Sequence, residues 1–179
     1  MKKLLIIIAI LAWHNLAAAD VSQKEISKVA VKEAKKYRKD SWQEMPGAFP
    51  LECQISAALL KEQEVESDDM PKYFLITVIA EDCNLEAARQ KAIEMAKMRI
   101  ASTISSEIKN VINVTVAGDC TEFGSFGSTK VYSRIGVVIP SVECWRKASP
   151  DLFEVMLTVL YETAQANKIC DEIMATKYE

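Results

Sequence analysis

The longest regular pattern of apolar and polar positions runs through residues 83–112. This stretch has no glycine or proline, Asn84 stands where a helix N-cap is expected, and Glu86 lies in the first turn. Apolar residues recur at steps of three and four, the period of one helical face: Ile93, Ala96, Ile100, Ile104, Ile108 and Val111. Flatter residues lie beside that row: Leu85, Ala88 and Ala92. Charged residues take the opposite face: Arg89, Lys91, Glu94, Lys97 and Lys109. We predict a long helix covered on one side by a flat partner such as a sheet.

Three segments carry the pattern of β-strands. Residues 72–81 are rich in aromatic and β-branched residues. Alternate positions of a strand point to opposite faces, and both sets of positions are apolar here, which predicts a strand covered on both faces. Residues 137–147 and 152–161 predict two more strands, joined by a hairpin turn at 148–151, and Pro140 indicates a bulge or an exposed edge in the first. The last strand has an uninterrupted apolar face, which we expect to be the floor under the long helix: Phe153, Val155, Leu157, Val159 and Tyr161.

Helices are predicted at both ends of this core. The S-x-x-E capping box at 22–25 opens a helix that runs to about Lys39, and residues 45–50 break it. Pro50 suits the start of a short helix over 51–61. A last helix over 163–178 is expected to cover the second face of the sheet, while residues 113–133 fit either a continued helix or a short strand. The fold class is therefore α+β.

The first 19 residues have the pattern of a secretory signal peptide. A basic start at 1–3 precedes a short apolar run at 4–13, and the alanines at 17–19 supply a cleavage site. We expect removal of residues 1–19, a mature chain that begins at Asp20, and an exported protein. The mature chain is expected to divide into an N-terminal helical segment, 20–62, and an α+β core domain, 70–179.

Cleavage changes the charge and the chemistry of the chain. Removal of two lysines leaves a formal charge of 20 − 25 = −5, with residues 20–40 carrying +3 and the remainder −8. A basic amphipathic helix suits an anionic membrane or polymer, and a solvated lysine-rich helix is the simpler interpretation. The only histidine, His14, is removed, which excludes Ser-His-Asp, Cys-His and histidine-containing metal sites. We predict no catalytic, cofactor-binding or metal-binding residues.

Five cysteines remain in a compartment that permits disulfides: Cys53, Cys83, Cys120, Cys144 and Cys170. No two of them form a CxxC motif, and their odd number leaves at least one thiol unpaired within a monomer. The simplest interpretation is that they are small buried apolar residues. The alternative is one structural disulfide that involves Cys53 or Cys170.

Residues 42–54 contain the pattern W-x(3)-PGA-x-PLE-x-Q, residues 71–73 are P-K-Y, and residues 88–96 contain A-[RK]-x(2)-A-x(3)-A. These motifs resemble a turn, a strand and a helix of a group of secreted envelope proteins of Bacteroides-type bacteria, which is similar to the LPP-twenty family of envelope lipoproteins. The resemblance covers about residues 31–161. It implies a strand–helix–strand–strand layout, with a long helix across a curved antiparallel sheet, and a location in the periplasm or at the outer membrane. It brings no catalytic residues, and the family's lipid-bearing cysteine is missing after the signal.

Three functions compete. The leading hypothesis is a non-enzymatic envelope module that binds another protein, a cell-wall polymer or the outer membrane. The second is a carrier of an apolar ligand between helix and sheet, for which Met95 and Met98 are available. The third is an enzyme that uses Glu143 and Glu154, if the hairpin brings them together, with outward-facing strand charges as the simpler interpretation. The apolar strand 72–81 also makes a homo-oligomer conceivable, and no nucleic-acid partner is predicted.

Overall fold

The computed structural model describes residues 23–66, 70–115 and 124–175, so the signal-like segment lies outside the described residues. In chain order the elements are α2 (Gln23–Lys39), β1 (Gln43–Glu44), α3 (Leu51–Glu62), β2 (Tyr73–Asp82), α4 (Leu85–Thr115), α5 (Gly124–Arg134), β3 (Val142–Ser149), β4 (Leu152–Glu162) and α6 (Thr163–Ala175). Among these helices none is both long and apolar enough to cross a membrane.

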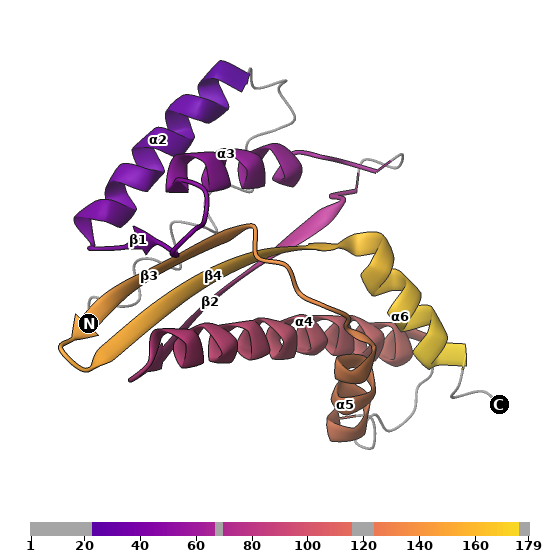
Figure 1. The fold of residues 1–179 in the computed structure, drawn as a ribbon. Coiled ribbons are helices and arrows are strands. Elements are labelled where there is room, and N and C mark those ends of the chain that lie inside the picture. Colours follow the sequence, from indigo (N-terminus) through magenta and orange to yellow (C-terminus); the bar gives the residue numbers. More distant parts are fainter. Residues whose placement is uncertain (1–22, 67–69, 116–123, 176–179) are drawn as a thin grey trace.

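The four strands form one open antiparallel sheet in the order β1-β3-β4-β2 (Figure 1). Strand β2 pairs with β4 along its whole length, from Tyr73 opposite Glu162 to Asp82 opposite Phe153. Strands β3 and β4 form the expected hairpin. The α+β class and the strand–helix–strand–strand order are confirmed. Strand β1 was not expected, because two residues are too short a segment to show an alternating pattern.

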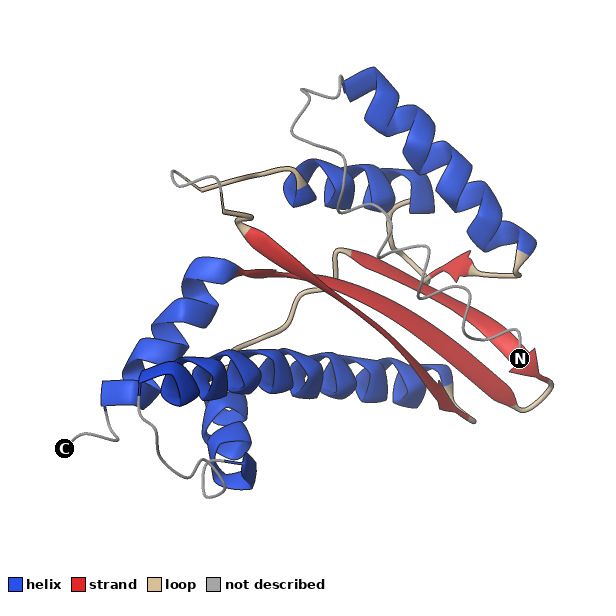
Figure 2. Cartoon of the chain, turned by 180° about the vertical axis from the view of Figure 1, so that it is seen from behind, coloured by secondary structure: helices blue, strands red, loops and turns tan. Residues whose placement is uncertain are grey.

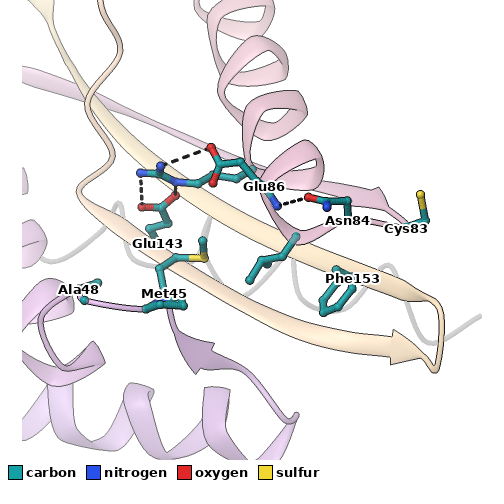
Figure 3. A pocket seen from close by; sticks show the side chains of 11 residues that line it. Met45, Ala48, Cys83, Asn84, Glu86, Glu143 and Phe153 are labelled. Atoms are coloured by element: carbon teal, nitrogen blue, oxygen red, sulfur yellow. Dashed lines mark hydrogen bonds and ion pairs between the residues drawn. The ribbon is translucent and has the colours of Figure 1, made fainter.

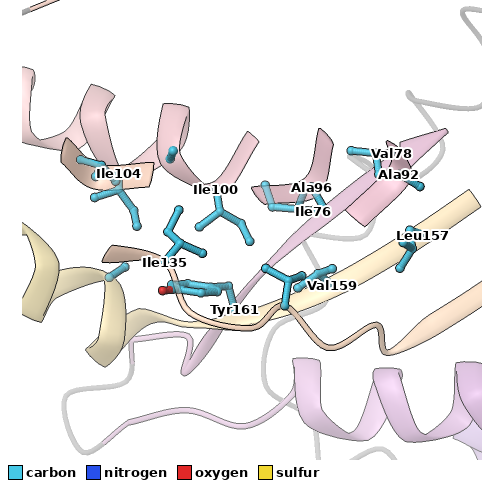
Figure 4. Packing of buried hydrophobic residues seen from close by; sticks show 14 of the residues in the cluster. Ile76, Val78, Ala92, Ala96, Ile100, Ile104, Ile135, Leu157, Val159 and Tyr161 are labelled. Atoms are coloured by element: carbon cyan, nitrogen blue, oxygen red, sulfur yellow. The ribbon is translucent and has the colours of Figure 1, made fainter. Parts of the chain in front are cut away.

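Helix α4 lies along one face of the sheet, as predicted (Figure 4). Its front half meets the strands through Ala88, Ala92 and Ala96, which are all fully buried, because a methyl side chain lets the helix backbone approach a flat surface closely. The back half packs through larger side chains, Ile100 and Ile104 among them. The expected floor is confirmed at four positions that are buried in this cluster: Val155, Leu157, Val159 and Tyr161.

The second face of the sheet is covered by α2 and α3, not by α6. A separate apolar cluster joins Ala34, Leu51 and Ile55 of this helical pair to Cys144 of β3 and Met156 of β4. Helix α6 instead packs on the side of α4, where its buried residues join the main cluster (Figures 1 and 2). The expectation for α6 was wrong because an amphipathic stripe shows that a helix is covered and does not show by what.

Two strand predictions also need correction. Residues 137–141 are not part of β3: Val137 and Ile139 are 90% and 75% exposed, and Pro140 has no N–H with which to continue the ladder. Strand β2 is well covered only on the α4 side, since Ile79 on its other face is 42% exposed. The ambiguous region contains helix α5, within residues 124–134.

Candidate functional site

A groove of about 660 Å³ opens where the turn at 45–48 faces the first turn of α4 (Figure 3). Glu143 of β3 and Phe153 of β4 complete its walls, so the groove is formed by three separate regions of the chain: the turn, the start of α4 and the β3–β4 hairpin. Its apolar lining residues are Met45, Leu85 and Phe153, and its charged lining residues are Glu86, Arg89 and Glu143. The groove is thus part apolar and part ionic.

The N-terminus of α4, which forms one side of the groove, is capped by Asn84. The N–H groups of Glu86 and Ala87 donate to Oδ1 of Asn84 at 2.8 and 3.2 Å, which confirms Asn84 as the N-cap. Before it, Asp82 Oδ1 accepts from the Cys83 thiol and the Asn84 N–H, each at 3.4 Å. The bond from the Cys83 thiol makes the largest contribution to lowering the pKa of Asp82, and the bond from the Asn84 N–H adds to it. Because the N–H groups of Asn84, Glu86 and Ala87 already have partners, this terminus is not an open anion site.

The floor of the groove is an ion pair between Arg89 and Glu143. Arg89 Nε lies 2.5 Å from Glu143 Oε1, and Nη2 lies 3.3 Å from Oε2, so the guanidinium meets the carboxylate at two points. The bond to Glu143 raises the pKa of Arg89. Sequence analysis placed Arg89 on the solvent face of its helix, whereas it is half-buried against β3. The pattern gave no sign of this partner, 54 residues away.

The opposite wall, the turn at 45–48, is held to the sheet by Gln54. Its Oε1 accepts from the N–H of Glu143 at 2.8 Å, and its Nε2 donates to the carbonyl of Phe49 at 2.6 Å. Gly47 adopts φ 81°, a left-handed conformation that favours glycine. One amide side chain therefore ties the turn to the strand that carries the groove's carboxylate.

A second set of contacts supports the same turn through Glu44. Its Oε1 accepts from the N–H of Leu51 at 3.1 Å, and its backbone carbonyl accepts from the Trp145 indole at 3.0 Å. Arg38 donates to both Glu44 and Glu52 at 2.6 Å. Hydrogen bonding to Arg38 lowers the pKa of Glu52 to about 2. The wall is thus built into the fold before anything binds.

The two carboxylates of the enzyme hypothesis do not meet. Glu143 and Glu154 side chains lie on opposite faces of the hairpin, Glu143 with α4 and Glu154 with the α2–α3 side. Glu154 pairs with Arg146 at 2.5 Å, and that guanidinium stacks over Trp42 at 4.5 Å from the ring centre. Both glutamates are buried rather than outward-facing, so neither the paired interpretation nor the solvated one is correct. Alternation along the strands separates them.

The helix–sheet interface proposed for an apolar ligand is occupied by the protein's own side chains. Ile100, Ile104 and Leu157 are at most 1% exposed there. Met95 is half-buried against this cluster, while Met98 is 54% exposed and points away from it. The two methionines therefore do not line a common cavity.

The described cysteines are all free thiols. Cys144 is buried, and burial raises its pKa to about 12, whereas Cys53 and Cys83 are exposed and Cys170 is half-buried. The alternative, a disulfide through Cys53 or Cys170, does not form among the described cysteines, and the buried-apolar interpretation fits Cys144 fully and Cys170 in part, since Cys170 packs against the main cluster. Cys120 lies outside the described residues. Within the described ranges no group of three histidine, cysteine or acidic side chains is placed to hold a metal ion.

Comparisons with known proteins add no identification, because no family model, no curated protein and no solved structure matches this chain.

Proposed function

We propose that this protein is an exported, non-enzymatic binding module of the bacterial cell envelope, and that it holds a segment of another envelope protein in the groove beside α4. The signal-like residues 1–19 motivate the export. The resemblance to LPP-twenty-like envelope proteins motivates the location, in the periplasm or at the outer membrane.

One observation carries the choice of binding over catalysis. The buried carboxylate of the groove, Glu143, is engaged at both oxygens by Arg89. A proton transferred by this carboxylate would have to disturb its two-point contact with Arg89, so the pair suits a binding or structural role better than general acid–base catalysis. The pair instead gives the groove a fixed polar floor, and the wall at 45–48 is already tied down by Gln54.

The lining of the groove indicates what kind of segment fits. Met45, Leu85 and Phe153 offer an apolar contact for one side chain of the ligand. Among the charged lining residues, two acids and one base give a net charge of −1, and the Glu86 side chain is 63% exposed at the rim. We therefore propose a protein segment with an apolar residue next to a lysine or arginine as the occupant.

A photocrosslinking amino acid at Ala48, an exposed position that lines the groove, tests the proposal in cells that produce the full chain. The crosslinked segment is mapped by mass spectrometry, and the matching synthetic peptide is titrated against the purified protein. We expect an apolar-basic peptide, with binding weakened at least about tenfold by Ala48→Arg, which fills the groove with a like charge.

The matched control is Ala164→Arg, the same change at an exposed alanine of α6, far from the groove. It is expected to leave peptide affinity unchanged. Equal affinity of the peptide for both arginine variants would contradict the proposal, as would a crosslinked segment without basic residues. Export is tested separately by intact mass of the protein recovered from the envelope fraction, which is expected to begin at Asp20.

A further inference from the structure

Strand β2 forms an edge of the sheet, and two hydrogen bonds indicate which of its backbone N–H and C=O groups face away from β4. The N–H of Thr163 donates to the Lys72 carbonyl at 2.9 Å, and the N–H of Ser141 donates to the Thr158 carbonyl at 2.8 Å. In an antiparallel sheet both backbone groups of a residue point the same way, and the direction alternates along the strand. Even-numbered residues of β2 therefore face β4, and odd-numbered residues face outward: Tyr73, Leu75, Thr77, Ile79 and Glu81.

The outward backbone groups in the middle of β2 have no partner within the described part of the chain. No strand lies beyond β2 in the sheet, and no side chain bonds to the backbone of Leu75, Thr77 or Ile79. At the far end the Lys91 ammonium donates to the Glu81 carbonyl at 3.1 Å, which agrees with the derived direction. An edge strand of ten residues with unpaired groups is a template for another strand.

Exposed apolar side chains flank this edge on both sides of the sheet. Ile79 is 42% exposed on the face away from α4. On the other face, the contact of Lys91 with the Glu81 carbonyl shows that one side of α4 lies next to this edge. Met98 follows Lys91 by about two helical turns, so it lies on the same side of α4, where it is 54% exposed. An added strand would therefore gain both backbone hydrogen bonds and apolar contacts.

We propose that the occupant of this edge is the β2 edge of a second copy of the protein, paired antiparallel about a two-fold axis at Thr77. This register sets Leu75 opposite Ile79 of the second copy, and Thr77 opposite its own equivalent. It also sets Lys72, the residue before the strand, opposite Asp82 of the second copy at both ends; within its own chain the Lys72 ammonium contacts Glu64 at 2.8 Å. A basic residue precedes the strand and two acidic residues end it, so antiparallel self-pairing matches opposite charges, whereas parallel pairing would oppose like charges.

The charge distribution also selects one register for this self-pairing. Moving the axis from Thr77 to Val78 would place Glu81 opposite Leu75 and lose the pairing of Lys72 with Asp82. With the axis at Thr77, the three central pairs alone exchange about six backbone hydrogen bonds. The inference rests on the edge of β2 and not on the groove beside α4, so each can fail independently.

Sedimentation velocity of the mature full-length protein tests the dimer. We expect a concentration-dependent dimer at micromolar protein, and loss of dimer in Ile79→Pro. Proline removes an N–H that faces away from β4, so the strand can keep its own ladder while the outer edge is blocked. Val137→Pro makes the same kind of change at a 90% exposed β-branched residue outside the sheet, and is expected to remain dimeric.

Charge exchange tests the register. Lys72→Asp and Asp82→Lys are each expected to weaken dimerisation roughly tenfold, because each opposes like charges at both ends of the interface. The double variant K72D/D82K is expected to restore it. Circular dichroism of every variant checks that the monomer is folded. A wild-type chain that stays monomeric up to about 100 µM, a folded Ile79→Pro that still dimerises, or a double variant that is not restored would overturn the inference.

Discussion

Arg89 of α4 and Glu143 of β3 are joined at two points, Nε to Oε1 at 2.5 Å and Nη2 to Oε2 at 3.3 Å. The pair links the start of the long helix to a strand that also receives Gln54 from the α3 side. Glu143 therefore receives contacts from elements on both sides of the sheet, from Arg89 to its side chain and from Gln54 to its backbone N–H. The pair therefore has a structural role as well as its place in the groove.

Removing one partner of this pair is expected to destabilise the fold. Arg89→Ala leaves the carboxylate of Glu143, whose side chain is 11% exposed, without its counter-ion. We expect a loss of about 2 kcal/mol in the free energy of unfolding, below the value for a fully buried pair because Arg89 is 35% exposed. Urea unfolding measures it. The double variant Arg89→Met/Glu143→Leu is expected to recover most of the loss, and an Arg89→Ala variant as stable as wild type would contradict the role.

The close approach of α4 to the sheet predicts a strong size limit at Ala92. This side chain is fully buried against the strands, so Ala92→Leu forces the helix away from the sheet or strains its neighbours. The expected cost is about 1–3 kcal/mol in the free energy of unfolding, measured with denaturant. Ala87→Leu is the matched control on the exposed side of the same helix and is expected to change stability by less than about 0.5 kcal/mol. Equal effects of the two changes would contradict the packing.

Thiol labelling at pH 8 is expected to separate the cysteines. Cys53 and Cys83 are exposed and should react quickly with an alkylating reagent. Cys144 should remain unlabelled in the native state, because burial excludes the reagent and raises the thiol pKa to about 12. Peptide mapping after timed labelling gives the rate at each position, and all cysteines should react in denaturant. Rapid labelling of native Cys144 would contradict its placement.

Stability is expected to fall with acid through Glu52. Its folded pKa of about 2 lies below the ordinary value of a glutamate, so the unfolded chain binds the proton more readily. The contribution of Glu52 to stability is therefore present above about pH 4.5 and is lost as pH falls toward 2. Unfolding free energies of wild type and Glu52→Gln, measured across this range, should converge at the acid end. Parallel curves would rule out this contribution.

The resemblance motifs acquire a physical interpretation from the contacts around the groove. Gly47, Gln54 and Glu52 belong to the turn pattern recognised in the sequence, and each helps to fix the wall of the groove or its approach. The groove itself could not be predicted from the sequence. Met45 and Phe153 are apolar residues of a common kind, and only the fold brings them together with Glu86 around one groove.

The sequence by itself determined the local elements: the long helix and its buried alanine and isoleucine row, the β3–β4 hairpin, the apolar face of β4 and the N-cap at Asn84. Those features depend on periodicity and capping within about one element, which the order of residues contains directly. Only the tertiary structure decided that α2 and α3, rather than α6, cover the second face, and that Arg89 meets Glu143 while Glu154 meets Arg146. Such pairings depend on which amphipathic surfaces meet in three dimensions, and many combinations satisfy the same one-dimensional pattern.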